Sequence, residues 1–132
     1  MRLWHYKLLP FLPKDMLVSQ WREIVAIKRQ WEKGSLKHRL VSYVKEYNKA
    51  YFLNYAELVL EEFKKRSINY NFNLYKEIYN FCTNGLNESN NYPEHNDRYL
   101  KQCYYNLEEK ADRGIISEEE WKEIKECIGI CN

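Results

Sequence analysis

The residue types with the clearest chemistry lie at the start of the chain and on its first predicted helix. Met1 carries an α-amine, which titrates at about 7.7–8.0 when unperturbed, so a useful fraction is unprotonated where a lysine amine is almost fully charged. The helix predicted over residues 14–32 carries Arg22 and Glu23, and Arg2 follows the amine directly. An amine nucleophile near a carboxylate and arginines could attack an electrophilic sugar carbon. Met1 and Glu23 are therefore the candidate catalytic residues.

The polar face of this predicted helix could form a recess for a phosphate and a sugar. On a helical wheel Arg22 and Arg29 lie on nearly the same line, and Glu23 lies roughly 100° further round. Ser19 and Ala26 lie between them, and their small side chains would let a substrate approach the backbone. An ordinary solvated polar face has the same pattern. The spacing alone leaves both interpretations open.

Three histidines, His5, His38 and His95, could act as acids or bases. They could also bind a metal together with Glu94 or Asp97, but their spacing matches no zinc signature. We therefore expect no metal site and no cofactor. A metal-dependent hydrolase built on these histidines is nevertheless kept as an alternative.

The cysteines and the absence of targeting signals indicate a cytoplasmic protein. No apolar run approaches the length of a membrane span, and the N-terminus lacks the apolar stretch and cleavage site of a secretory signal. We therefore expect no membrane association. The four cysteines are expected to be reduced thiols, and the apolar neighbours of the last three predict small core residues. They are Cys82, Cys103, Cys127 and Cys131.

Aromatic residues are frequent in the N-terminal half and could stack on bases or fill a gap in a duplex. Trp21 and Trp31 lie on the apolar stripe of the first predicted helix, so we predict that both belong to the core. Trp4 and Tyr6, near the start of the chain, are the better candidates for ligand contact.

The formal net charge of +2 conceals a large difference between the two halves of the chain. Residues 1–66 hold fourteen Lys and Arg against seven Asp and Glu, whereas residues 67–132 hold seven against twelve. A basic surface that covers phosphates releases condensed counterions, which is the general source of affinity for nucleic acid. A polyanionic partner would therefore meet the N-terminal half. A solvated basic face without a partner would have the same charge pattern.

Helical spacing of apolar residues dominates wherever a pattern can be read, so we predict an all-α fold. Besides residues 14–32, it predicts a short helix or turn over 36–47 and a helix over 50–66. Glu62 and Arg66 are four residues apart and would support the exposed side of that last helix. Residues between these segments read as turns.

Residues 67–91 have a different composition, rich in Asn and Tyr. We expect a mobile connection there, with one short helix over 74–81 and a turn at Asn84-Gly85. This is the least regular part of the chain.

Two further helices are predicted after this connection. The first begins after Asn96 or Asp97 as a cap and runs to about Asp112. Ser117 and Glu120 form a capping box for the second. Its apolar stripe consists of Trp121, Ile124, Ile128 and Cys131. Together these patterns predict a single compact helical domain of about five helices over residues 1–132.

Four segments of the chain carry a resemblance to a known family. They are Met1-Arg2-Leu3-Trp4-His5, Leu17-Val18-Ser19-Gln20-Trp21-Arg22-Glu23, His38 before Tyr43-Val44, and Tyr92-Pro93-Glu94-His95-Asn96-Asp97. Together they resemble the small prokaryotic relatives of the phage pyrimidine-dimer DNA glycosylase, also called endonuclease V. The resemblance covers most of the chain and is weakest over residues 67–91.

This resemblance implies a compact all-α enzyme that repairs damaged duplex DNA as a glycosylase with an associated abasic-site lyase activity. The α-amine of Met1 would attack C1′ of the damaged nucleotide, expel the base and form an imine, and β-elimination would cleave the strand. Glu23 would stabilise the cationic sugar and move protons. The duplex would be kinked and a nucleotide flipped out.

The resemblance also implies DNA contacts. Arg2 and Arg22 would contact phosphates or the damage site. Met16 and Ala26 stand where the phage enzyme has a histidine and an arginine, so we expect nearby cations to supply the missing charge. The remaining expected DNA contacts are Trp4, His5, Lys28, Arg29, His38 and His95.

A non-catalytic helical module that binds nucleic acid or a protein is the alternative from another functional class. It would keep the scaffold and bind DNA in a salt-sensitive way, without a covalent adduct or a strand nick. In either case we expect a monomer.

Overall fold

The computed structural model describes residues 1–83 and 89–131, with side chains described as far as residue 127. Five α-helices and two short 3-10 helices make up this part of the chain, and no strand occurs in it. They are η1 (Tyr6–Phe11), α1 (Lys14–Glu32), η2 (Ser42–Glu46), α2 (Lys49–Lys65), α3 (Phe72–Cys82), α4 (Asp97–Asp112) and α5 (Glu118–Cys131). The predicted all-α class with about five helices is confirmed.

Side-chain caps explain where the last two helices begin. The Tyr99 N–H donates to Asn96 Oδ1 at 2.9 Å, so Asn96 caps α4 as predicted. At the start of α5 the Glu120 N–H donates to Ser117 Oγ at 3.1 Å, and the Ser117 N–H donates to the Glu120 carboxylate at 3.0 Å. This reciprocal pair confirms the predicted capping box.

Two elements in the middle of the chain differ from the predicted ones in length. The stretch 36–47 contains only η2. Val44 within it and Val41 just before it are three residues apart, and both are fully buried. That spacing suits the three-residue repeat of a 3-10 turn. Helix α3 begins earlier than residue 74 because the Asn71 side chain caps it by accepting from the Asn73 N–H. The predicted turn at Asn84-Gly85 lies outside the described residues.

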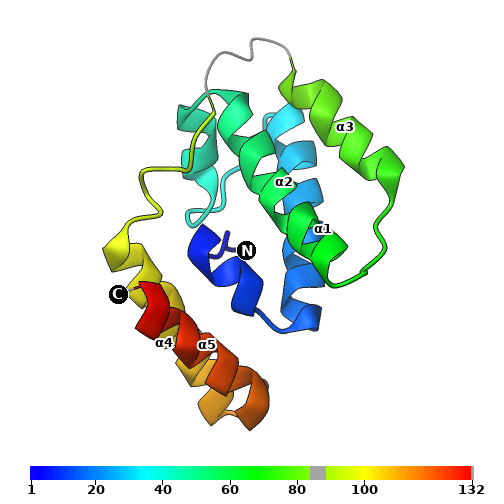
Figure 1. Cartoon of the computed structure of the whole chain (residues 1–132). Helices are drawn as coiled ribbons and strands as arrows, with labels where there is room; N and C mark the ends of the chain where they lie inside the picture. Colours follow the sequence, from blue (N-terminus) through cyan, green and yellow to red (C-terminus); the bar gives the residue numbers. More distant parts are fainter. Residues whose placement is uncertain (84–88, 132) are drawn as a thin grey trace.

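Two groups of helices lie on either side of the N-terminal segment (Figure 1). Helices α1, α2 and α3 pack against one another, and α4 packs against α5. The short helix η1 contacts α2 on one side and α5 on the other. Leu3 and Leu8, from this segment, are fully buried. The start of the chain is therefore part of the hydrophobic core that joins the two groups.

The two tryptophans predicted to lie in the core do pack against its aromatic residues. Trp21 is 5% exposed and makes an edge contact with Phe63. Trp31 is half-buried and makes edge contacts with Phe52 and Phe81. Edge-to-face arrangements of this kind are favourable for aromatic rings.

The cysteines whose side chains are described lie in the core. Cys82, Cys103 and Cys127 are free thiols and are all buried, which confirms Cys103 and Cys127 as core residues. Burial raises the pKa of the Cys82 thiol to about 11, which disfavours the thiolate. The side chains of Ile128 and Cys131 lie outside the described residues. None of the described helices is long and apolar enough to cross a membrane.

Arg66, immediately after α2, holds the end of η1. Its Nε donates to the Glu62 carboxylate at 2.8 Å, so the predicted pair is present. The pair does not lie on the exposed side of the helix as predicted, because Glu62 is only 8% exposed. Its terminal nitrogens donate to the carbonyl oxygens of Leu12 at 2.7 Å and Pro10 at 3.0 Å. One guanidinium therefore binds carbonyl groups at the end of η1 that the short helix itself leaves unpaired.

We expect Arg66→Met to lower the free energy of unfolding by about 2–3 kcal/mol, because hydrogen bonds from a charged group are lost and two carbonyl groups lose their donor. Urea unfolding measures this difference. Arg113→Met is the matched control, since Arg113 pairs with Glu109 at 3.7 Å on a well-exposed surface and should change the free energy by less than about 0.5 kcal/mol. Equal effects of the two substitutions would contradict this role of Arg66.

Candidate active site

The site is built around Gln20, a polar residue of α1 that is only 1% exposed. Its Oε1 accepts from the Trp4 N–H at 2.7 Å, and its Nε2 donates to the Arg2 carbonyl at 2.9 Å. The Tyr55 hydroxyl of α2 also lies at the junction, 3.0 Å from Gln20 Oε1 and 2.6 Å from the Trp4 carbonyl. One buried amide thus fixes the first residues of the chain to α1.

Glu23 belongs to the same hydrogen-bond network. Gln20 Nε2 donates to Glu23 Oε2 at 3.1 Å, so the two hydrogens of this amide go to the Arg2 carbonyl and to the Glu23 carboxylate. Glu23 is partly exposed, whereas Gln20 beneath it is buried. The carboxylate is therefore tied through Gln20 to the carbonyl of Arg2, the residue that follows the N-terminal one, and is still partly open to solvent.

A pocket of about 180 Å³ lies beside the Glu23 carboxylate. The predicted recess is present in part, because Ser19 lines this pocket together with Met16. Ala26 and the two arginines of the predicted recess are not among its lining residues. A cation from α4, Lys110, lines the pocket instead. The full lining is Trp4, Met16, Ser19, Gln20, Glu23 and Lys110.

The N-terminal amine lies at the surface next to a histidine. The Met1 nitrogen is 3.3 Å from His38 Nε2. The guanidinium of Arg2 lies over two rings, 5.8 Å from the centre of Trp4 and 5.9 Å from that of Tyr99. Cations over aromatic faces are attracted by the ring quadrupole. Of the predicted site residues, His38 therefore contacts the amine, whereas the Arg2 guanidinium lies over aromatic rings.

His5 and His95 are in the interior, 1% and 6% exposed. His5 Nδ1 accepts from the Lys7 N–H at 3.1 Å, and His95 Nδ1 accepts from the Tyr6 N–H at 3.3 Å. His95 Nε2 lies 2.8 Å from the Tyr43 hydroxyl. We expected His5 and His95 to contact DNA, but both rings are buried and do not present a surface for such a contact. The geometry assigns both rings to holding the N-terminal segment in place.

Both buried rings are neutral at physiological pH. Burial lowers the pKa of His5 from 6.5 to about 4, and it lowers the pKa of His95 from 6.5 to about 3, with a further contribution from His5. Trp4, also expected to touch DNA, is 8% exposed and belongs to the core, although it lines the pocket beside Glu23. Tyr6, the other aromatic residue expected to contact a ligand, is more exposed than Trp4.

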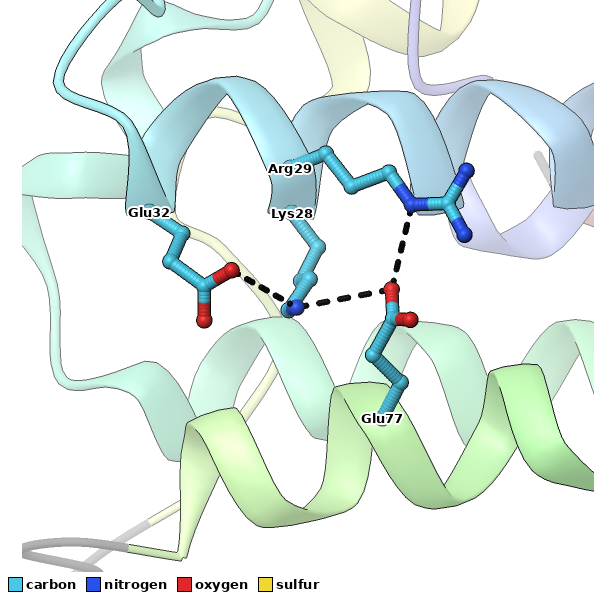
Figure 2. A network of polar contacts seen from close by, with 4 residues as sticks. All are labelled: Lys28, Arg29, Glu32 and Glu77. Atoms are coloured by element: carbon cyan, nitrogen blue, oxygen red, sulfur yellow. Dashed lines mark hydrogen bonds and ion pairs between the residues drawn. The ribbon is translucent and has the colours of Figure 1, made fainter.

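Lys28 and Arg29, expected to supply charge to the site, pair with acidic residues instead (Figure 2). Lys28 Nζ is 3.1 Å from Glu32 and 3.4 Å from Glu77 of α3, and its side chain is 5% exposed. Arg29 Nε is 3.2 Å from the same Glu77 carboxylate. The arginine holds the pKa of Glu77 below its usual value, helped by the lysine. These two cations join α1 to α3, whereas Arg22 on the same helix is exposed.

Across residues 1–83 and 89–131, no group of three or more His, Cys, Asp or Glu side chains is placed to hold a metal ion. The three histidines do not converge: two are buried together, with ring centres 5.4 Å apart, and His38 is exposed beside Met1. The arrangement offers an amine, a carboxylate and cations as its reactive groups.

A family model described as pyrimidine dimer DNA glycosylase matches residues 1–78. The chain belongs to this family. It is thus a member of a family of DNA repair enzymes, and DNA is its implied partner. The matched range contains Met1, Gln20, Glu23 and His38 and ends within α3. No curated protein and no solved structure matches the chain.

Sequence reasoning missed two residues of this candidate site. Gln20 lies on the apolar stripe of α1, with Leu17 three residues before it and Ile24 four residues after it, and both neighbours are fully buried. A polar residue on such a stripe must find partners inside the protein, which is a signal that could have identified it. Lys110 carries no comparable signal, because it reaches the pocket only through the packing of α4.

We expect Gln20→Leu to lower the free energy of unfolding of this glycosylase by about 3 kcal/mol, because it leaves the Trp4 N–H and the Arg2 carbonyl without partners inside the protein. Hydrogen exchange at the Trp4 amide should accelerate more than exchange within α2. Gln102→Leu is the control, since Gln102 is exposed on α4 and its side chain should matter little. Unchanged exchange at Trp4 would exclude Gln20 as the anchor.

The buried histidines predict a loss of stability in acid. Their pKa values are lower in the folded protein than the unfolded value of 6.5, so below that pH the unfolded chain binds more protons and the free energy of unfolding falls. The slope should reach about 1.4 kcal/mol per pH unit for each histidine between pH 6.5 and about 4. Urea unfolding across this range tests it. His95→Gln should reduce the slope, and an undiminished slope would refute the assignment.

Proposed function

We propose that this chain is a DNA glycosylase with an associated abasic-site lyase activity, in which the Met1 α-amine is the nucleophile and Glu23 its acid-base partner. The observation that carries the proposal is the double hydrogen bond of Gln20, which ties the Arg2 carbonyl and the Glu23 carboxylate to one buried amide. Holding two reacting groups in place removes much of the entropic cost of bringing them together. Glu23 also remains open to a substrate.

The proposed reaction begins when the amine lone pair forms a bond to C1′ of the damaged nucleotide. The bond between C1′ and the base breaks, and the base leaves with its electron pair. Glu23 then carries one proton from the nitrogen to the ring oxygen O4′, the bond between C1′ and O4′ breaks, and a protonated imine results. Loss of a C2′ proton expels the 3′-phosphate and nicks the strand, and water releases the enzyme.

The charge around the pocket suits a DNA backbone. Arg22 is exposed on α1 and Arg2 is partly exposed beside the amine, so both can contact phosphates. Lys110 adds a cation to the lining of the pocket. We propose damaged duplex DNA containing pyrimidine dimers as the substrate, with a nucleotide flipped out so that C1′ can be reached.

A monomer acting in the cytoplasm is part of the same proposal. The free thiols of Cys82, Cys103 and Cys127 suit a reducing compartment.

Borohydride trapping tests this function. Incubated with duplex DNA that contains an abasic site or a pyrimidine dimer, the protein should form a covalent adduct whose cross-linked peptide begins at Met1. Glu23→Gln should lower turnover by at least about 100-fold, because general acid-base groups contribute that much or more, and should leave DNA binding nearly intact. Glu61→Gln, an exposed carboxylate on α2, is the matched control.

The outcomes separate the proposed enzyme from the non-catalytic module. Absence of an adduct with wild-type protein, together with salt-sensitive DNA binding, would favour the module. An adduct that persists after selective acetylation of the α-amine would exclude Met1 as the nucleophile. Equal loss of binding and turnover in Glu23→Gln would assign Glu23 a structural role.

A further inference from the structure

A second pocket, which the proposed chemistry does not use, is formed by two distant parts of the chain. One part is the segment from residue 39 to η2, and the other ends in the first two turns of α4. The volume of the pocket is about 330 Å³, within the range of roughly 300–1,000 Å³ that holds small ligands. The lining side chains that bear on its chemistry are Arg39, Leu40, Tyr43, Glu94, Arg98 and Tyr99.

One side of this second pocket is joined to the N-terminal amine through Leu40. The Leu40 N–H donates to Nδ1 of His38 at 3.3 Å, and Nε2 of the same ring is 3.3 Å from the Met1 nitrogen. The turn is fixed, because the His38 carbonyl accepts from the N–H groups of Val41 and Ser42 at 3.1 and 2.9 Å. The amine and the pocket are therefore held by the same turn.

The other side of the second pocket is joined to the pocket beside Glu23. Tyr99 lines the second pocket, and the Arg2 guanidinium lies 5.9 Å from the centre of its ring. The same guanidinium lies 5.8 Å from the ring centre of Trp4, which lines the pocket beside Glu23. Arg2 thus contacts a lining residue of each pocket, so a DNA strand at the proposed reaction site also reaches the second pocket.

The charged groups that the second pocket offers to a ligand are two guanidinium groups. Arg39 and Arg98 are exposed, and within the described part of the chain neither guanidinium has a hydrogen bond or an ion pair. The acidic lining residue, Glu94, accepts from the Tyr47 hydroxyl at 3.0 Å with one oxygen, and its other oxygen is buried. That carboxylate is therefore engaged with the protein. Guanidinium groups bind phosphates through paired hydrogen bonds.

Apolar surface lies beside these two arginines. The Leu40 side chain is 45% exposed, and Tyr43 and Tyr99 contribute aromatic rings to the same lining. A nucleotide combines the matching chemistries, because its phosphates bind cations while its sugar and base bury apolar surface and contact aromatic rings.

From this arrangement we infer that the second pocket is a DNA subsite beside the reaction site. Arg39 and Arg98 bind backbone phosphates of a nucleotide that flanks the reacting one, and Leu40 contacts its sugar or base. This inference rests on the proposed function, which places DNA at Met1. It extends the DNA-binding surface to α4, beyond residues 1–78 that match the family and into the half of the chain with a negative formal charge.

Salt-dependent binding tests this subsite without requiring the reaction. The probe is a duplex that contains tetrahydrofuran, an abasic-site analogue that cannot form an imine, and fluorescence anisotropy gives its Kd over a range of salt concentrations. The double variant Arg39→Gln, Arg98→Gln should reduce the slope of log affinity against log salt by about 1.8, because each lost phosphate contact removes about 0.9. Each single variant should weaken binding about two- to fivefold. Arg98→Lys, which keeps the charge, should keep the slope.

Two further variants separate the subsite from general electrostatic and structural effects. Lys101→Gln is the matched control, since Lys101 is an exposed cation of α4 outside the pocket lining, and it should leave the slope unchanged. Leu40→Ala should weaken binding about two- to fivefold, because apolar contact is lost, and should not alter the slope.

Several results would overturn the inference. The first is a wild-type slope in the double variant, which would exclude phosphate contacts by the two arginines. The second is an equal reduction of the slope in Lys101→Gln, which would indicate a diffuse effect of net charge. The third is unchanged affinity in Leu40→Ala, which would exclude a nucleotide in the pocket.

Borohydride trapping separates failure of this inference from failure of the proposed function. If wild type forms no adduct with abasic DNA but the double variant still lowers the salt slope, the proposed reaction fails and the subsite stands. If wild type forms the adduct and the double variant keeps the wild-type slope, only the subsite fails. A wild-type protein that does not bind the analogue duplex would overturn both.

Discussion

The burial of the Gln20 amide is the constraint on which the rest of the structure depends. An amide taken out of water is costly unless its donors and acceptor are paired, and this one has partners for its oxygen and both hydrogens. Two of the partners, at Arg2 and Trp4, are backbone groups of the N-terminal segment. Because leaving the buried amide unpaired is costly, these two bonds fix the location of the start of the chain.

This location turns a normally loose end into part of the core. Chain termini are usually poorly ordered unless packing holds them, and here Leu3 and Leu8 are fully buried while η1 lies between α2 and α5. The Tyr99 hydroxyl donates to the Leu3 carbonyl at 2.5 Å and adds a tie from α4. The amine of Met1 consequently lies at the surface close to His38, two residues before the buried Leu3. An exposed amine on a buried support suits the precise positioning that the proposed reaction requires.

Some of the basic residues of the N-terminal half form ion pairs or hydrogen bonds within the fold, whereas others are exposed to solvent. Lys28 and Arg29 join α1 to α3 through Glu77, and Arg66 binds the carbonyl groups at the end of η1. These three cations stabilise the fold and are already paired. The formal charge of this half therefore overstates the positive charge that DNA would meet, which comes from residues such as Arg22 that are exposed.

Much of the fold follows from local patterns in the sequence. The bounds of α1, the cap at Asn96, the capping box of Ser117 and Glu120 and the pair of Glu62 with Arg66 all depend on residues within one or two helical turns. Such spacing is visible without knowledge of the packing. The sequence also pointed to Met1 and Glu23, because an α-amine and a helical carboxylate have recognisable chemistry wherever they lie.

Tertiary structure alone decided what these groups touch. The contact of Met1 with His38 joins residues 37 positions apart, and that of Tyr6 with His95 joins residues 89 apart. No local pattern encodes such contacts. Burial likewise distinguished Lys28, paired in the interior, from Arg22, open to solvent, although both are cations on one helix. The sequence determined the helices and the reactive groups they carry, whereas packing decided which of those groups meet, because burial and long-range hydrogen bonds exist only once the helices are assembled.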